Sequence, residues 1–202
     1  MKENKMNKKE VINHAMSFKF GGMSENELSY LYDICIDKTV LELGSMAGMS
    51  SYVIASVAQN LSCVDVWNDT YDHLSHDLKQ KMVYLQYRKE ILSIFKKFNE
   101  NCKNFILSGK IRIYRGNTID MANEFLDKSF DIVLIDADHS YRGVSQDFKL
   151  YKDKVKDGGL IVFHDYGDSM WTGVATLANE MAETGQIEII GRTERIGVFR
   201  KL

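Results

Sequence analysis

The sequence of 202 residues contains no proline and only three cysteines. Cys35, Cys63 and Cys102 lie far apart and form no C-x-x-C pair, which argues against disulfides and against a zinc site and is typical of buried thiols in a reducing compartment. No apolar run approaches the roughly 18 residues that span a membrane, and the N-terminus lacks the apolar core of a signal peptide. These absences predict a cytoplasmic protein without a membrane segment.

A strong excess of charge of one sign is also lacking. The formal net charge is -2, so general attraction to nucleic acid is not indicated. Hydrophobic residues make up 45% of the chain, which is too many for a disordered protein. The length fits a single domain over residues 1–202 with a core of its own. A homo-oligomer remains an open alternative.

What the chain does contain is a short apolar run followed by a glycine turn. Residues 40–43 predict a buried strand that carries one acidic residue, Glu42. Gly44 and Gly48 punctuate the turn, and we expect Ser50 to cap the helix that follows. Because glycine has no Cβ, a ligand can approach the backbone N–H groups of such a turn closely.

The spacing of the two glycines indicates which ligand the turn would bind. A dinucleotide fingerprint requires G-x-G-x-x-G, but Met46 stands where its middle glycine should be, which disfavours a nicotinamide-dependent oxidoreductase. The pattern Glu-x-Gly-x-x-x-Gly instead resembles motif I of class I S-adenosylmethionine-dependent methyltransferases. That resemblance implies that Glu42 and the loop 44–48 hold the methionyl end of the cofactor. On its own, a glycine turn between a strand and a helix can also be a plain connection.

A second strand, predicted over residues 61–66, carries Asp65 near its end and is followed by Trp67. An acidic residue at this place, some twenty residues after the glycine turn, can accept hydrogen bonds from two ribose hydroxyls. The alternative is a strand-end aspartate that faces water, and we favour the ribose. Trp67 fits two roles equally well, as a wall of the adenine pocket or as part of the core.

Two segments flank these elements. Residues 1–37 predict an N-terminal helical cap, in which Ser24 and Glu27 form a capping box at the start of a helix. The cap could cover the cofactor cleft or simply pack on the sheet. Residues 68–107 are long for a crossover between strands, and they predict one helix with an insertion that could recognise the substrate.

The same crossover contains two histidines among acidic residues. His73 and His76 invite a metal site, but they lack the surrounding pattern of a metal centre, so a solvated insertion is the preferred interpretation. The segment 79–110 is locally basic. Such a charge run is typical of a solvated helix face, although it would also attract an anionic substrate.

Polar residues follow the later strands too. The strand predicted at 111–114 is followed by Asn117, at the position where related methyltransferases contact the adenine edge, although turn chemistry alone would explain an asparagine there. The most informative segment is the buried strand that starts at Phe130, because it ends in two carboxylates and an imidazole, those of Asp136, Asp138 and His139.

The last strands complete the pattern. Residues 157–159 predict a turn into a fifth strand, 160–163, which ends at His164 and Asp165. Strands that alternate with helices predict an α/β fold, a Rossmann-like doubly wound sheet of seven mostly parallel strands with a C-terminal antiparallel hairpin at 187–191 and 196–200. Ligands of such sheets bind at the carboxyl ends of the strands. The polar residues singled out so far all fall at that edge: Asp65, Asn117, Asp136, Asp138, His139, His164 and Asp165.

Two motifs about twenty residues apart extend the resemblance over residues 24–200. Ile-Asp-Ala-Asp-His-Ser-Tyr paired with Gly-Gly-Leu-Ile-Val-Phe-His-Asp-Tyr resembles small-molecule O-methyltransferases of the macrocin O-methyltransferase and cephalosporin-hydroxylase-like group, and more distantly catechol O-methyltransferase. The resemblance implies that Asp136 and Asp165 hold a divalent cation, such as Mg²⁺, and that His139 is the general base. Where catechol-type enzymes have Asp-Asn, this chain has Asp-Tyr, so the third ligand is missing or becomes His164. The alternative is that Asp136 orders the amino group of the cofactor and Asp165 caps a loop.

The sequence therefore predicts an S-adenosylmethionine-dependent methyltransferase that acts on a hydroxyl of a small molecule. His139 is the expected base. The residues expected to bind the cofactor are Glu42, Gly44, Ser45, Gly48, Ser50, Asp65, Trp67, Asn117 and Asp136, and those expected to bind the cation are Asp136, His164 and Asp165. The rival interpretations are a nicotinamide-dependent oxidoreductase and a module that keeps the fold without catalysing a reaction.

Overall fold

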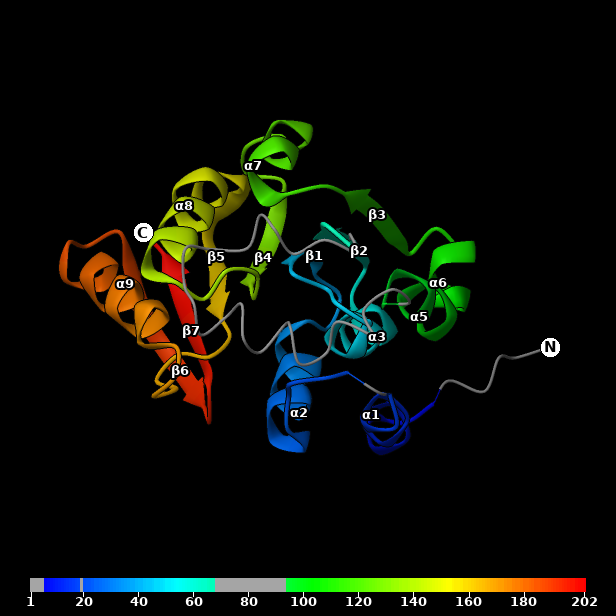
Figure 1. Cartoon of the computed structure of the whole chain (residues 1–202). Helices are drawn as coiled ribbons and strands as arrows, with labels where there is room; N and C mark the ends of the chain where they lie inside the picture. The colour runs from blue at the N-terminus through cyan, green and yellow to red at the C-terminus, as the bar shows by residue number, and fades with distance from the viewer. Residues whose placement is uncertain (1–5, 19, 68–93) are drawn as a thin grey trace.

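A computed structural model describes residues 6–18, 20–67 and 94–202. Within these ranges seven strands form one sheet in the order β3-β2-β1-β4-β5-β7-β6 (Figure 1). The first five strands along the chain are parallel, and β7 runs antiparallel to both of its neighbours. This confirms the predicted sheet. The strands are β1 (Thr39–Leu43), β2 (Asn60–Asp65), β3 (Ile111–Arg115), β4 (Phe130–Ile135), β5 (Val155–Phe163), β6 (Ile187–Thr193) and β7 (Ile196–Lys201).

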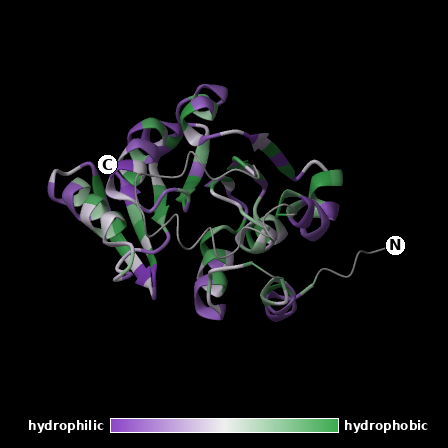
Figure 2. Ribbon diagram, viewed as in Figure 1, coloured by the Kyte–Doolittle hydropathy of each residue, from purple (hydrophilic) through white to green (hydrophobic). Residues whose placement is uncertain are grey.

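The central strands are apolar on both faces. In β4, Ile132 and Leu134 belong to one buried cluster, while Val133 and Ile135 belong to another on the opposite face. Side chains alternate along a strand, so an uninterrupted apolar run is what a sheet covered on both faces requires. Figure 2 shows the resulting hydrophobic centre of the sheet.

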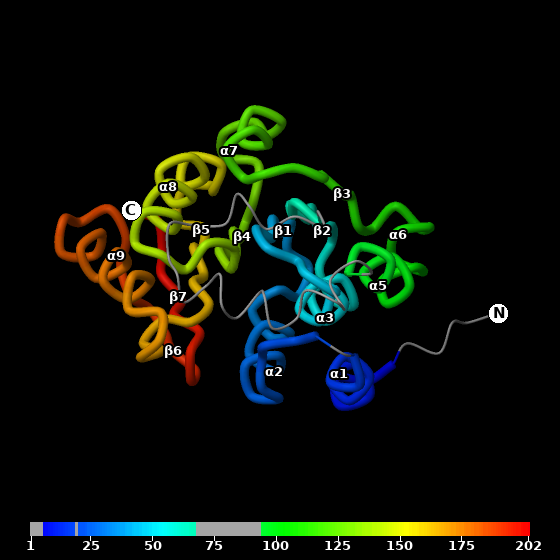
Figure 3. The backbone as a smooth tube through the Cα atoms, in the orientation of Figure 1, coloured from blue at the N-terminus to red at the C-terminus, as the bar shows by residue number. Residues whose placement is uncertain are grey.

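Helices cover the two faces (Figures 1 and 3). One face carries α1 (Lys8–Met16), α2 (Glu25–Ile34), α3 (Met49–Val57), α5 (Ile94–Asn101) and α6 (Lys103–Leu107). The other carries α7 (Thr118–Met121), α8 (Tyr141–Tyr151) and α9 (Thr172–Glu183), with short 3₁₀ turns at Ala122–Glu124 and Lys152–Lys154. The helices α1 and α2 share a buried cluster with α3. No helix in the described ranges has both the length and the apolarity to cross a bilayer.

The structure corrects two predicted boundaries. The fifth strand begins at Val155 and runs through residues 157–159, which we expected to be a turn. Gly158 has φ +70°, and the register of β4 with β5 shifts beside it, so the extra residues form a bulge rather than a chain reversal.

The crossover helix is also different from the prediction. Two short helices, α5 and α6, replace the single one, because the chain leaves the helical conformation at Cys102, where φ is -101° and ψ is 9°. The thiol of Cys102 is buried and lies 3.6 Å from the carbonyl oxygen of Gly48. His73, His76 and the first part of the basic segment 79–110 lie outside the described residues.

Candidate active site

The strand order reverses between β1 and β4, which lie side by side although their connections leave toward opposite faces. In open α/β sheets, ligands bind outside the carboxyl ends of the strands at such a point. Gly44, just after β1, has φ +89°, and a Cβ there would lie 2.2 Å from the carbonyl oxygen of Asp136. Only glycine permits this approach between the ends of β1 and β4.

Three of the seven non-glycine residues with positive φ in the described part of the chain lie at the same edge. Met46, Trp67 and Asp165 have φ of +45°, +35° and +57°, and they follow β1, β2 and β5. A left-handed conformation of a residue other than glycine costs about 1–3 kcal/mol and is found most often at functional sites. Met46 occupies the position of the missing fingerprint glycine and adopts a left-handed backbone conformation.

Glu42 lies beneath this loop and is fully buried. Its carboxylate accepts hydrogen bonds from the hydroxyls of Ser45 at 2.6 Å, of Ser50 at 2.5 Å and of Ser51. Burial raises the pKa of Glu42, and the three hydroxyls oppose that rise. The expected cap was wrong, because Gly48 is the N-cap residue of α3 and the hydroxyl of Ser50 points to Glu42. Glu42 thus braces the loop, while its role toward the cofactor stays a prediction.

Asp65, at the end of β2, receives the backbone of the same loop. Its Oδ2 accepts from the N–H groups of Ser45 at 3.0 Å and Met46 at 2.8 Å, and its Oδ1 accepts from that of Trp67 at 2.9 Å. Burial raises the pKa of Asp65 against the opposing effect of these N–H groups. The carboxylate therefore links β2 to the glycine loop whether or not a ribose is bound.

Trp67 is part of the core. Its side chain is 4% exposed, its ring centroid lies 5.1 Å from that of Phe95 and 4.7 Å from that of Phe98, and its indole N–H donates to the carbonyl oxygen of Met46 at 2.7 Å. Of the two roles that the sequence left open, the structure supports packing.

Asn117 caps α7. Its Oδ1 accepts from the backbone N–H of Asp120 at 2.8 Å, and its amide donates to the carboxylate of Asp120 at 2.5 Å. Turn chemistry therefore explains this asparagine, and a contact with adenine stays a prediction.

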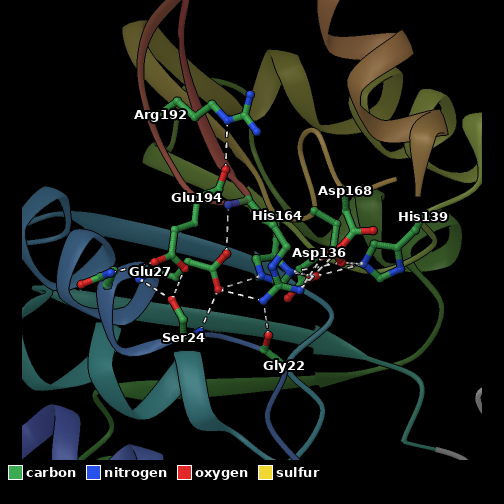
Figure 4. A network of polar contacts seen from close by, with 12 residues as sticks. Gly22, Ser24, Glu27, Asp136, His139, His164, Asp168, Arg192 and Glu194 are labelled. Atoms are coloured by element: carbon green, nitrogen blue, oxygen red, sulfur yellow. Dashed lines mark hydrogen bonds and ion pairs between the residues drawn. The ribbon is translucent and has the colours of Figure 1, made fainter. Parts of the chain in front are cut away.

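Four side chains converge at the ends of β4 and β5 (Figure 4). The Nε2 of His139 lies 3.1 Å from Oδ1 of Asp136 and 2.9 Å from Oδ2 of Asp165. The Nδ1 of His164 lies 3.0 Å and 3.3 Å from the same two oxygens. We call Asp136, His139, His164 and Asp165 the quartet. Asp138 lies apart from these contacts and accepts from the backbone N–H of Ser140 at 2.8 Å.

The electrostatics of the quartet follow from these contacts. Burial disfavours the imidazolium forms, but Asp136 and Asp165 more than compensate and raise the pKa of His139 to about 9. Asp136 above all raises the pKa of His164 to about 12. The histidines in turn hold the pKa of both aspartates below the usual range, against the effect of burial. In the quartet, two imidazoles that favour the protonated form therefore face two carboxylates that favour the ionised form.

Two residues that the sequence did not single out for the site complete this balance. Arg195, in the turn between β6 and β7, donates to Oδ1 of Asp165 at 3.0 Å and to Oε2 of Glu27 at 2.9 Å. Glu27 is fully buried, and contacts with His164, Ser24 and Arg195 lower its pKa to about 2 in spite of burial. Figure 4 shows Glu27 and His164 within this network. If both histidines of the quartet are protonated, three carboxylates face three cations.

Trp171 is a further residue that the sequence did not single out. Its ring lies over the imidazole of His139, with centroids 5.2 Å apart and planes inclined by 31°. The ring precedes α9 and is partly exposed. An aromatic side chain thus borders the imidazole of His139.

The quartet has the donor atoms that a divalent cation requires. Two carboxylate oxygens and two imidazole nitrogens all lie within 4.8 Å of one another. Oxygen and nitrogen ligands at such separations can meet one cation after a small contraction. The residues present therefore fit the predicted cation, with His164 in the place of the third ligand.

A further buried carboxylate lies beside the start of α7. Asp147 on α8 is 2% exposed, accepts from the hydroxyl of Thr118 at 2.5 Å, and has an Oδ2 without a hydrogen-bond partner among the described residues. Burial raises its pKa from 3.8 to about 7. The folded state thus favours the protonated acid.

This has a consequence for stability. As the pH rises from about 4 through 7, the unfolded chain ionises Asp147 before the folded one does, so the folded state loses up to roughly 4 kcal/mol. Asp147→Asn should keep the acceptor for Thr118, should be more stable than the native chain at pH 8 and should lose this pH dependence. Urea unfolding at pH 5 and pH 8 measures both effects. Asp153→Asn, at an exposed position, is the control, and an equal stability of Asp147→Asn and the native chain at pH 8 would contradict the prediction.

Comparison with known proteins places this geometry in context. A family model described as a methyltransferase domain matches residues 41–166. An uncharacterised protein of Acanthamoeba polyphaga mimivirus is 49% identical over 47 residues, 23% of this chain and 21% of that protein. The chain therefore matches only about a fifth of the length of this curated relative.

Solved structures share the whole fold at low sequence identity. A Staphylococcus aureus protein proposed to be a caffeoyl-CoA O-methyltransferase is 14% identical with a TM-score of 0.67, covering 98% of this chain and 93% of that one. The Podospora anserina methyltransferase PaMTH1, bound to SAH, is 12% identical with a TM-score of 0.66, covering 95% and 86%. The MycE methyltransferase in complex with Mg, SAH and mycinamycin VI is 17% identical with a TM-score of 0.61, covering 98% and 54%.

The family model spans more than half of the chain and includes the glycine loop, Asp65 and the quartet. The sheet of seven strands is the one that these methyltransferases share. The chain belongs to the methyltransferase-domain family and is a class I S-adenosylmethionine-dependent methyltransferase.

Proposed function

We propose that this methyltransferase transfers the sulfonium methyl group of S-adenosylmethionine to a hydroxyl oxygen of a small molecule. The observation that carries the proposal is the quartet, which brings a histidine and a cation-binding set of donors to the ends of β4 and β5. Gly44, which begins the glycine loop, lies against the backbone of Asp136. The donor loop and the acceptor chemistry thus share one edge of the sheet.

The reaction depends more on the relative position of the two reactants than on covalent activation of either one. The hydroxyl oxygen must approach the methyl carbon in line with the carbon–sulfur bond, which a preformed site achieves by holding both molecules. The oxygen forms a bond to the methyl carbon, the carbon–sulfur electron pair returns to sulfur, and the hydroxyl proton must leave. His139 is the residue we assign to accept that proton at Nε2, and it must be neutral to do so. A cation held by Asp136 and Asp165 would offset the two carboxylates that favour its imidazolium form.

The cofactor side is formed by the loop after β1 and the end of β2. We assign Asp65 to the ribose hydroxyls and the loop 44–48 to the methionyl end, with Glu42 as the brace beneath it. Gly48, Ser45 and Ser50 shape this loop, and Asn117 and Asp136 border the cofactor on the side of β3 and β4. Support comes from the contacts of Asp65 with the loop backbone.

A divalent cation fits the same proposal. When bound, it lowers the pKa of an acceptor hydroxyl and so makes the oxygen a better nucleophile. Asp136 and Asp165 would hold it, with His164 as the third ligand. The geometry of the four donors supports this assignment.

The acceptor class rests on the site and on two neighbours. MycE was solved with mycinamycin VI, and the Staphylococcus aureus protein is proposed to methylate oxygen. By analogy, the acceptor here is a hydroxylated small molecule. Trp171 offers a flat apolar surface beside His139 on which such a molecule can rest.

Binding of the reaction product tests the assignment of the cofactor. At 100 times its dissociation constant, S-adenosylhomocysteine should stabilise the protein by about 2.7 kcal/mol, which raises Tm by roughly 5–10 °C for a chain of this size. NAD should give no shift. A shift with NAD but none with S-adenosylhomocysteine would contradict the proposal.

A screen of hydroxylated acceptors, read as S-adenosylhomocysteine formed from S-adenosylmethionine, then tests catalysis. A protein that binds S-adenosylhomocysteine but methylates none of the sugars, phenols and macrolides in the screen would favour the non-catalytic module.

A further inference from the structure

The two imidazoles of the quartet are held in different ways. The side chain of His139 is 14% exposed and packs against Trp171, whereas His164 lies in the interior with 4% of its surface exposed. The Nδ1 of His164 faces the oxygens of Asp136 and Asp165 at 3.0 Å and 3.3 Å. Its Nε2 points the other way and lies 3.7 Å from Oε2 of the fully buried Glu27, just beyond hydrogen-bond distance, and it has no hydrogen-bond partner among the described residues (Figure 4).

This arrangement is close to a recurring feature of metal sites, and a shift of a few tenths of an ångström would complete it. An imidazole that binds a metal through one nitrogen usually donates the N–H of the other nitrogen to a carboxylate, which fixes the tautomer and the orientation of the ring. The Nδ1 of His164 faces two carboxylates, so it carries either a proton or a cation. A cation bound there would take the place of that proton and leave the hydrogen of the ring on Nε2, which faces Glu27.

We propose that His164 binds the cation through Nδ1, that Glu27 orients the ring from its other side, and that the site therefore takes a transition-metal ion such as Zn²⁺ or Co²⁺ in preference to Mg²⁺. The proposal rests on the cation site of the proposed function. Mg²⁺ prefers ligands that are all oxygen, whereas Zn²⁺ and related ions favour imidazole nitrogen. One nitrogen among the ligands thus changes which ion is preferred.

Glu27 is itself held rigidly. Its Oε2 accepts from the backbone N–H of Ser24 at 2.8 Å and from the guanidinium of Arg195 at 2.9 Å. The backbone N–H of Arg195 donates to its Oε1 at 3.1 Å. Because both oxygens are fixed, the carboxylate keeps a constant position 3.7 Å from Nε2 of His164.

The same guanidinium also orients the second ligand. Arg195 donates to Oδ1 of Asp165 at 3.0 Å, which leaves Oδ2 turned toward the quartet. Glu27 and Arg195 thus act behind the ligands, one on His164 and one on Asp165. From the sequence, Glu27 was predicted only to form a capping box with Ser24, and its contacts with Arg195 and His164 were not predicted.

Metal binding to the chelator-treated full chain tests the proposal. Calorimetry with Co²⁺, Zn²⁺ and Mg²⁺ measures the preference, and the visible absorption of bound Co²⁺ reports its ligands. We expect Co²⁺ and Zn²⁺ to bind at least about tenfold more tightly than Mg²⁺. Glu27→Gln should weaken Co²⁺ about 10–100-fold and alter its spectrum, as loss of an outer-shell partner does.

The matched control is Glu194→Gln. Glu194 contacts Ser24 and Asn26 at the same junction between α2 and the β6–β7 turn, but it is exposed and belongs to no contact of the quartet. This variant should bind Co²⁺ as the native chain does. Should Glu27→Gln fail to fold, as its melting curve would show, His164→Gln provides the second test. Glutamine offers an oxygen, so the preference should move toward Mg²⁺.

Three results would overturn the proposal: equal affinity for Mg²⁺ and Co²⁺, an unchanged Co²⁺ affinity in a folded Glu27→Gln, or an unchanged preference in His164→Gln. Calorimetry with S-adenosylhomocysteine on the same samples separates this proposal from the proposed function. A chain that binds S-adenosylhomocysteine without the metal preference retains the function and loses only the inference. A chain that does not bind it contradicts the function itself.

Discussion

His139→Ala should lower kcat by about 10²–10⁴-fold and leave the affinity for S-adenosylhomocysteine unchanged. A positioned general base contributes a factor of this size, and the imidazole contacts the carboxylates of Asp136 and Asp165 rather than the glycine loop. The loss should therefore appear in the chemical step and not in cofactor binding. Turnover is measured with an acceptor from the screen, and the affinity by calorimetry.

The control for this variant is His14→Ala. His14 is an exposed histidine on α1 that packs against Phe18 and Tyr52, far from the strand ends in sequence. It should retain full turnover. His164 cannot serve as the control, because it is buried and contacts both aspartates. Full turnover in His139→Ala, with its fold intact, would remove His139 from the role of base.

Asp65→Ala should weaken S-adenosylmethionine roughly 10²–10⁴-fold. Two hydrogen bonds between a carboxylate and ribose hydroxyls are worth about 1.5–3 kcal/mol each. The variant also releases the N–H groups of Ser45 and Met46, which the carboxylate holds in the native chain. Both effects act against binding, and calorimetry measures their sum.

Asp131→Ala is the control that distinguishes loss of the ribose contact from a general loss of stability of the sheet. Asp131 lies at the start of β4, on the opposite edge, and its carboxylate also accepts from the backbone N–H of a neighbouring strand, that of Thr39 at 2.8 Å. It should lower stability without weakening the cofactor. Equal cofactor affinity in the native chain and in Asp65→Ala would show that Asp65 serves the loop alone.

The fold could be predicted from the sequence because the patterns that indicate its strands and helices are local. Short apolar runs, glycine turns and helical spacing are set by neighbours in the chain, and they predicted the seven strands and the hairpin. The start of β5 was missed because Gly158 and Gly159 are typical of a turn, while pairing with β4 made them a bulge. Only the partner strand could decide between the two.

The site was predictable where it follows from strand ends. Parallel strands end at one edge, so Asp136, His139, His164 and Asp165 had to lie near one another. The contacts of Glu27 with Arg195 had no such signal, because 168 residues separate the partners. The capping box had already accounted for Glu27. Asp138 looked equivalent to Asp136 in sequence, but its carboxylate is used by the turn that begins α8.

Glu27 links the N-terminal end of α2 to the candidate active site, because it takes part in the contacts of both. The first turn of a helix ordinarily frays more easily than the core unfolds. In α2 the residue that closes the capping box is also the buried anion that faces His164 and Arg195. Opening this turn would deprive His164 and Arg195 of one of their anionic partners, so the helix end and the site form one cooperative unit. Helix α2 is thereby a structural part of the site, and not an accessory to the sheet.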